Sequence, residues 1–167
     1  ATANDAWIAD FVAFCDDQDV SADFISTHHY PTDAFGKPGD DTETQLSTAT
    51  RGILRQRTQD TCRAAAGRPV IYTEWCSSSN PFYHGHDEPY AAAFLLKNLL
   101  DVAELVHGYS WWTFSDIFEE NYFSSVPFHG GFGLQTIHGI AKPTYHVFRL
   151  LHRIGHERLL VDGMHHT

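Results

Sequence analysis

Hydrophobic and polar positions follow two different periods along this chain, and stretches with the two periods alternate. Apolar residues at helical spacing predict helices over residues 5–15, 42–66, 88–107 and 143–154. Compact runs of β-branched and aromatic residues predict strands over residues 22–30, 70–76 and 109–114. Because strands separated by such helices are joined by right-handed crossovers, this order predicts an α/β fold with a parallel sheet.

The first two predicted helices each have an apolar face that is expected to meet the core. Asn4 or Asp5 can cap the first helix. Its inward positions are Trp7, Ile8, Phe11, Val12 and Cys15. The second helix carries Leu46, Ala49, Ile53 and Leu54 inward, with Arg51, Arg55 and Arg57 in solvent. Gly67 can end this helix, because glycine adopts the left-handed conformation at little steric cost.

The third predicted helix has the clearest helical period in the chain. Its inward positions are Phe94, Leu95, Leu99, Val102, Ala103 and Val106. Asp87 is expected to cap it, Pro89 to lie in its first turn and Gly108 to end it. The last helix is expected to begin at Pro143 and to carry Tyr145, Phe148 and Leu151 in phase.

A single carboxylate interrupts the second predicted strand near its C-terminal end. Glu74 follows the apolar run Val70–Tyr72 closely and precedes a loop of small polar residues. A charge in an apolar run is costly unless it is paired or hydrogen-bonded. In chains that alternate strands and helices, catalytic groups lie at the C-terminal ends of parallel strands. Glu74 is therefore a catalytic candidate, and the alternative is a structural glutamate that caps a helix or pairs with an arginine.

Polar and aromatic side chains also lie at the ends of the other two predicted strands. They are His28 and Tyr30 in the first strand, Trp112 in the third, and Glu119 and Glu120 beyond it. If the three strands are adjacent, these side chains share one edge of the sheet with Glu74. Polar groups there can bind sugar hydroxyls while an indole packs on a sugar ring. Trp111 and Trp112 must point to opposite faces, because neighbours on a strand alternate.

The composition is typical of one globular domain and narrows the classes of partner. The chain has 167 residues, of which 43% are hydrophobic, and a net charge of −10 with histidine neutral. This charge disfavours nucleic acid and anionic membranes as partners, and no apolar run is long enough to span a bilayer. The first residues do not resemble a signal peptide, so localisation stays open between cytoplasmic and secreted. The aromatic residues, 14% of the chain, suit either a carbohydrate-stacking cleft or an ordinary aromatic core.

Several kinds of site have no support in the sequence. The three cysteines, Cys15, Cys62 and Cys76, are too few and too widely spaced for a disulfide framework or a zinc ribbon. None of the twelve histidines has a partner at a recognised ligand spacing, so we expect no metal and no cofactor. The glycine-rich Rossmann and Walker motifs and the Gly-x-Ser-x-Gly elbow are absent from the sequence.

Motifs spread over the whole chain resemble those of one enzyme family. They are Ser26–Pro31 (STHHYP), Tyr72–Trp75 (YTEW), Ser110–Glu120 (SWWTFSDIFEE), His129–Leu134 (HGGFGL) and the pair Lys142 and Pro143. The family is glycoside hydrolase family 39, whose bacterial β-xylosidase branch is more similar to the chain than its relative α-L-iduronidase. This resemblance implies an incomplete (β/α)8 TIM barrel, roughly strands 6–8 with flanking helices.

The resemblance also implies a reaction and a role for each residue at the shared edge. The reaction is retaining hydrolysis of terminal β-D-xylosyl residues through a covalent glycosyl-enzyme, with a xylo-oligosaccharide or an aryl-xyloside as substrate. The resemblance makes Glu74 the nucleophile, on the seventh barrel strand. His28 and Tyr30, on the sixth strand, are expected to line the site of the terminal sugar. Contacts with the sugar ring and its hydroxyls are expected from three residues after the eighth strand: Trp112, Glu119 and Glu120. The alternative function is a non-catalytic sugar-binding or assembly module.

The sequence departs from the family pattern in composition and in extent. Cys76 stands where the family leads us to expect asparagine, and the Asn-Glu-Pro motif that carries the general acid/base has no counterpart. Three βα units stand where a closed barrel has eight. We therefore expect residues 1–156 to form the C-terminal part of a barrel, and residues 157–167 the start of an accessory β-domain or a tail. A missing N-terminal barrel half or self-association is expected to cover the cut sheet.

Overall fold

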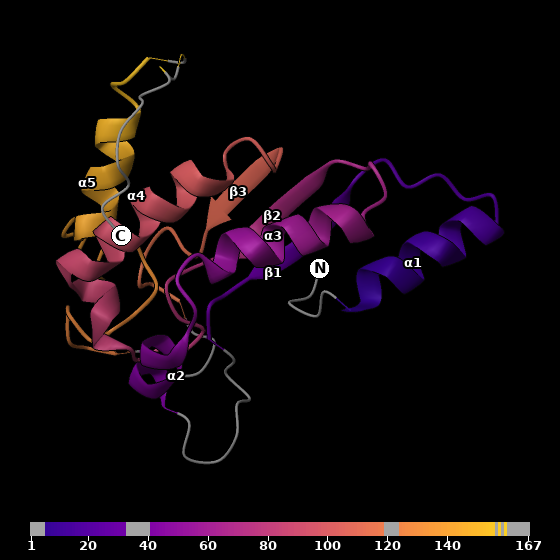
Figure 1. The fold of residues 1–167 in the computed structure, drawn as a ribbon. Helices are drawn as coiled ribbons and strands as arrows, with labels where there is room; N and C mark the ends of the chain where they lie inside the picture. The colour runs from indigo at the N-terminus through magenta and orange to yellow at the C-terminus, as the bar shows by residue number, and fades with distance from the viewer. Residues whose placement is uncertain (1–5, 33–40, 119–123, 156, 158, 160–167) are drawn as a thin grey trace.

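The structure alternates helices and strands as the hydrophobic pattern predicts (Figure 1). It is a computed structural model that describes residues 6–32, 41–118, 124–155, 157 and 159. The helices are α1 (Ala6–Asp17), α2 (Thr42–Thr48), α3 (Ile53–Ala64), the short 3-10 helix η1 (His84–Asp87), α4 (Pro89–Val102) and α5 (Pro143–Leu151). The strands are β1 (Ile25–His29), β2 (Val70–Trp75) and β3 (Gly108–Trp111).

The three strands form one parallel sheet in the order β1-β2-β3. Strand β2 lies in the middle and pairs with both neighbours. Helices α2 and α3 connect β1 to β2, and η1 and α4 connect β2 to β3. Because all three strands run the same way, their C-terminal ends meet at one edge. The predicted α/β fold with a parallel sheet is confirmed.

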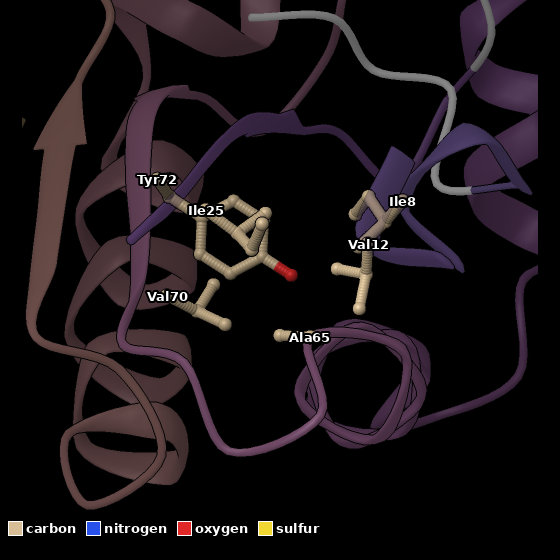
Figure 2. Close-up of a cluster of buried hydrophobic side chains, with 6 residues drawn as sticks. All are labelled: Ile8, Val12, Ile25, Ala65, Val70 and Tyr72. Atoms are coloured by element: carbon tan, nitrogen blue, oxygen red, sulfur yellow. The ribbon is translucent and has the colours of Figure 1, made fainter. Parts of the chain in front are cut away.

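The first core cluster lies between the sheet and helices α1 and α3. It consists of Ile8, Val12, Ile25, Ala65, Val70 and Tyr72, whose side chains point toward one another (Figure 2). Ile25 of β1 and Val70 and Tyr72 of β2 share one face of the sheet, because alternate residues of a strand point the same way. Each buried aliphatic side chain contributes about 1.5–3 kcal/mol relative to exposure. This face of the sheet is therefore covered by helices α1 and α3.

The second core cluster lies under α4 and α5, which pack side by side (Figure 1). Trp75 of β2, Leu95 of α4 and Val147 of α5 are its buried members. Tyr109 of β3 packs against both clusters, so the two clusters cover the same face of the sheet. The predicted inward positions Phe94, Leu99, Phe148 and Leu151 also pack here.

The predicted helix over residues 42–66 is wrong in one respect, because the structure divides it into α2 and α3. The break falls in a Ser/Thr-rich stretch in which the hydroxyls of Ser47 and Thr48 donate to backbone carbonyls of α2. Such bonds compete with helix propagation, and Gly52 has a left-handed φ of +76° before α3 begins. Gly67, with a φ of +83°, follows α3 in the predicted left-handed conformation.

The two boundaries predicted for the third helix are also wrong, although Pro89 begins α4 as expected. The Asp87 carboxylate does not cap the helix, because it accepts from Gly130 N over 2.7 Å and contacts a buried lysine. Helix α4 ends at Val102, and Gly108 is the first residue of β3. A Cβ atom at Gly108 would lie 3.0 Å from Ile71 Cγ2, so the glycine permits close approach of β2.

Helix α1 buries a narrower face than the apolar pattern predicts. Ile8, Val12 and Cys15 are buried, but Trp7 and Phe11 are 65% and 51% exposed. The prediction that these two rings point inward is therefore wrong within this chain, because they lie beside the buried stripe and not on it. The predicted caps of this helix fall outside the described residues. None of the helices that the structure describes is both long enough and apolar enough to cross a membrane.

Candidate functional site

An irregularity in β2 sets the geometry of the candidate site. Thr27 of β1 lies opposite Tyr72 of β2. The next residue of β1, His28, lies opposite Glu74, so Thr73 is an extra residue on β2. The register between β2 and β3 shifts over the same stretch. An extra residue in one strand is a β-bulge, and the side chains that follow it exchange faces.

The bulge turns Glu74 away from the hydrophobic core. Val70 and Tyr72 face the helices, and strict alternation would send Glu74 to the same side. Trp75 takes that place instead, since it is fully buried and stacks on Tyr109, which Tyr72 also contacts. Glu74 therefore lies on the open face of the sheet, where its charge avoids the cost of burial in the core.

Two side chains from the end of β1 hold the Glu74 carboxylate. The Tyr30 hydroxyl donates to Glu74 Oε1 over 2.5 Å, and His28 Nδ1 lies 3.2 Å from the same oxygen. The side chains of His28 and Glu74 are 25% and 19% exposed, so solvent reaches them. Among the residues that the structure describes, the hydrogen-bond and ion-pair partners of the carboxylate are a phenol and an imidazole, and not the helix end or the arginine of the structural alternative. These contacts show that Glu74 lies beside His28 and Tyr30, as the shared sheet edge predicts.

Arg57 supports this end of β1 from helix α3. Its guanidinium donates through Nη1 to the backbone oxygen of Tyr30 over 2.7 Å. The sequence pattern places Arg57 in solvent, and its side chain is exposed, but its charged end binds the backbone that carries the phenol. Pro31, the next residue, is buried. The backbone that carries the Tyr30 side chain is therefore fixed by the hydrogen bond from Arg57 and by the burial of Pro31.

His29 points to the side of β1 opposite to His28. Its ring stacks on Tyr72 with centroids 4.6 Å apart, and the Tyr109 hydroxyl lies 3.4 Å from its Nδ1. Burial, and after it the positive charge of Arg57, lowers the pKa of His29 to about 3. The imidazole is therefore neutral at neutral pH and belongs to the core behind the site. The sequence could not assign these separate roles to two adjacent histidines.

The two adjacent tryptophans make different contacts. Trp111 meets Trp75 edge-on, with centroids 4.8 Å apart, and packs under α4 and α5. Trp112 donates its backbone N–H to Trp75 O over 2.8 Å, which places it at the same end of the sheet as Glu74. Its ring contacts Phe118 with centroids 5.1 Å apart. The remaining predicted site residues, Glu119 and Glu120, lie outside the described residues.

A buried lysine joins the loops that follow β2 and β3. Lys142 Nζ lies 2.6 Å from Asp87 Oδ1 and 2.6 Å from Asp116 Oδ2, and it donates to Gly131 O over 2.9 Å. The lysine and Asp116 side chains are fully buried. A buried charge is tolerated only where it is paired and hydrogen-bonded, and three acceptors here match the three N–H groups of the ammonium. We call Asp87, Asp116 and Lys142 the aspartate–lysine clasp.

The clasp also fixes the glycine-rich segment that follows β3. Asp87 Oδ2 accepts from Gly130 N, and Asp116 Oδ1 accepts from Gly133 N, each over 2.7 Å. A Cβ atom at Gly131 would lie 2.4 Å from Asp116 Oδ1, so only glycine permits this approach. The clasp was not predicted from the sequence. Its members are distant in sequence: Asp116 and Lys142 stood in two separate motifs, and Asp87 was expected to cap a helix.

Cys76, the residue that departs from the family pattern, is an inert thiol in this structure. It is fully buried, and burial raises its pKa to about 12. A thiol needs its thiolate form to act as a nucleophile or a metal ligand. Among the described residues, no group of three or more histidine, cysteine, aspartate or glutamate side chains is arranged to hold a metal ion.

Comparison with known sequences places this geometry in a family. The profile of glycosyl hydrolases family 39 matches residues 1–167. A β-xylosidase from Caldicellulosiruptor saccharolyticus is 47% identical over 163 residues, which are 97% of this chain and 33% of that protein. A β-xylosidase from Geobacillus stearothermophilus is 35% identical over 173 residues, 96% of this chain and 33% of that protein. The chain thus spans about a third of the length of these relatives.

Solved structures agree with the sequence matches. A family 39 β-xylosidase from Caulobacter crescentus superposes with a TM-score of 0.74 at 28% identity, covering 91% of this chain and 31% of that one. The family 39 enzyme from Xanthomonas axonopodis pv. citri gives a TM-score of 0.74 at 30% identity, with 91% and 31% covered. These neighbours are TIM barrels, which agrees with the parallel α/β sheet described above. The chain belongs to glycosyl hydrolases family 39.

Proposed function

We propose that this chain is the nucleophile-bearing part of a retaining, β-xylosidase-like glycoside hydrolase, with Glu74 as the nucleophile. The observation that carries this proposal is the orientation of Glu74. A bulge turns its carboxylate onto the open face of the sheet, at the C-terminal edge, where Tyr30 and His28 hold it. Catalytic groups of TIM barrels occupy this edge.

The contacts of the carboxylate suit a nucleophile. Tyr30 and His28 both contact Oε1, so the other carboxylate oxygen, Oε2, is proposed as the attacking atom. In the proposed reaction, Oε2 attacks the anomeric carbon, the glycosidic C–O bond breaks, and the leaving oxygen takes a proton from a second carboxylic acid. Water then cleaves the glycosyl-enzyme with the second group acting as base, so the sugar is released with its configuration retained.

The second carboxylic acid is proposed to lie outside this sequence. In a retaining site the two carboxyl groups are about 5–5.5 Å apart, and the described contacts of Glu74 are a phenol and an imidazole. We infer that β1, β2 and β3 correspond to barrel strands 6, 7 and 8. Residues 1–156 then form the C-terminal part of the barrel, and residues 157–167 begin an accessory β-domain or a tail. The chain covers 33% of the length of each of two relatives, which supports the inference that it is part of a longer barrel.

The proposed substrate carries a terminal β-D-xylosyl residue, as in a xylo-oligosaccharide or an aryl-xyloside. Two relatives that match nearly the whole chain are named β-xylosidases, which supports this sugar. Trp112 is proposed to pack on the sugar ring, because it lies at the sheet edge that carries Glu74. Glu119 and Glu120 are proposed to bind hydroxyls of the same sugar.

The open face and edges of the sheet are proposed to be covered by the rest of a barrel, or by a second copy of this chain. Strands β1 and β3 each pair with β2 alone in the described sheet. Trp7, Phe11 and Phe14 are exposed at helical spacing on α1. Unpaired edges and apolar patches of this kind are association surfaces. A monodisperse monomer in light scattering, combined with a cooperative melt, would contradict self-association.

Labelling with an activated 2-fluoro-xyloside tests the proposed nucleophile. Its leaving group departs without protonation, so the covalent step can be observed in a chain that lacks the acid. Incubation followed by peptide mass measurement is expected to show one 2-fluoroxylosyl group on Glu74 and none in Glu74→Gln. Saturable binding without a covalent adduct would favour the sugar-binding module instead. An adduct on another residue would reject Glu74 as the nucleophile.

A further inference from the structure

The side chain of Thr73, the extra residue of the bulge, bonds across to the neighbouring strand where the register shifts. The shift between β1 and β2 lies between Thr27 and His28. Thr73 Oγ1 donates to Thr27 O over 3.3 Å, and it lies 3.3 Å from Ser26 Oγ. A side-chain hydroxyl therefore links the two strands at the one step where their regular pairing is interrupted.

We propose that Thr73 is a positioning residue, whose hydroxyl holds the bulge and thereby directs Glu74 toward Tyr30 and His28. The inference rests on the proposed function in one respect, that Glu74 is the nucleophile. Thr73 acts through the backbone: the bond to Thr27 fixes the extra residue, and the extra residue decides which face Glu74 occupies. Small displacements of a reacting group are costly, and about 1 Å can lower a rate 100-fold.

Because of the position of Thr73, the effect of its hydroxyl can be tested without a change in the packing of the core. Its side chain is exposed on the open face, while the buried face of β2 is occupied by Tyr72 and Trp75. Valine has the same shape and the same β-branch but cannot donate a hydrogen bond. Thr73→Val therefore removes the link to β1 without opening a cavity, and Thr73→Ser keeps the hydroxyl.

The first measurement reads the position of the carboxylate without any reaction. The hydrogen bond from Tyr30 to Glu74 is expected to give a hydroxyl proton signal in NMR spectra of the full chain, assigned by its loss in Tyr30→Phe. In Thr73→Val this signal is expected to shift upfield or broaden, and in Thr73→Ser to stay at the parent position. An unchanged signal in Thr73→Val, with the assignment secure, would overturn the proposal.

The second measurement is the rate of labelling by the activated 2-fluoro-xyloside. It is expected to fall about tenfold in Thr73→Val and to recover in Thr73→Ser, since one hydrogen bond is lost and regained. Equal rates in the parent and Thr73→Val would also overturn the proposal. If the parent is not labelled at all, the nucleophile role fails, and the hydroxyl signal alone decides whether Thr73 positions Glu74.

Ser26→Ala provides an independent variant in case Thr73→Val does not fold. It removes the hydroxyl that lies 3.3 Å from Thr73 Oγ1 and leaves β2 unchanged. A displaced Tyr30 signal in a variant with parent-like circular dichroism supports the inference. Where Thr73→Val is unfolded, Thr73→Ala takes its place, because it also removes the hydroxyl that donates to Thr27 O, and a parent-like signal there would overturn the proposal.

Discussion

Trp75 stacks face to face on Tyr109, with ring centroids 3.9 Å apart and planes inclined by 7°. Tyr72 meets the same Tyr109 ring edge-on at 5.3 Å. Two β2 residues three positions apart therefore contact one ring on the covered face of the sheet. This packing is compatible only with the bulged register, so it stabilises on the core side the arrangement that places Glu74 on the open side.

Replacing Trp75 by alanine is expected to lower the free energy of unfolding by about 3–5 kcal/mol, because a large buried ring is lost and a cavity remains. Urea unfolding followed by circular dichroism measures this change. Ile154→Ala is the control, since the Ile154 side chain is 60% exposed, and a change within about 0.5 kcal/mol is expected there. Equal losses in the two variants would contradict the packing described for Trp75.

Replacing Lys142 by methionine tests the aspartate–lysine clasp. Methionine fills a similar volume but leaves the Asp87 and Asp116 carboxylates buried without their cation, so a loss of about 3–5 kcal/mol in unfolding free energy is expected. Lys97→Met is the control, because Lys97 pairs with Asp101 on the surface of α4 and such pairs contribute about 0–1 kcal/mol. If Lys142→Met unfolds at the parent's urea concentration, the clasp does not stabilise the fold.

The alternation of elements and the meeting of His28, Tyr30 and Glu74 could be predicted from the sequence. Hydrophobic period identifies helices and strands locally, and a parallel sheet brings C-terminal strand ends to one edge by topology alone. The direction of Glu74 could not be predicted in the same way. An extra residue in a strand leaves no mark in the run Val-Ile-Tyr-Thr-Glu-Trp, because the extra residue, Thr73, is itself a favourable strand residue.

The features that the sequence pattern missed depend on contacts between distant segments. Asp87 has the spacing of a helix cap, but Lys142 and Gly130 bind its carboxylate instead. Trp7 has the spacing of a core position, but within this chain nothing described covers it. Local propensity is a weak prior wherever tertiary contacts compete for the same group.

The pH dependence of stability should carry a contribution from His29. Burial lowers its pKa from 6.5 to about 3, so the unfolded chain takes up a proton below about pH 6.5 while the folded chain does not. Stability is therefore expected to fall as pH decreases from about 6.5 toward 3, with His29 contributing up to about 1.4 kcal/mol per pH unit. Unfolding free energies measured between pH 4 and 7 give this slope.

His29→Phe isolates that contribution, because phenylalanine retains an aromatic ring against Tyr72 and does not titrate. Its stability is expected to depend less steeply on pH than that of the parent, although His86, whose pKa burial lowers to about 4, still contributes in both. His84→Phe, at an exposed position, should keep the parent slope. A parent-like slope in His29→Phe would show that the His29 imidazole is protonated in the folded chain.

Cys76 is expected to resist alkylation in the folded chain. Burial raises its pKa to about 12, so at pH 8 only about one thiol in 10,000 is ionised, and the sulfur is closed to solvent. Iodoacetamide followed by peptide mass measurement should find Cys76 unmodified before unfolding and modified in guanidinium chloride. Cys62, which is partly exposed although its pKa is also raised, is the internal control and should react faster. Reaction of Cys76 at the rate of the unfolded chain would show that the strand end beside Glu74 opens readily, and the fixed carboxylate geometry would then not hold in solution.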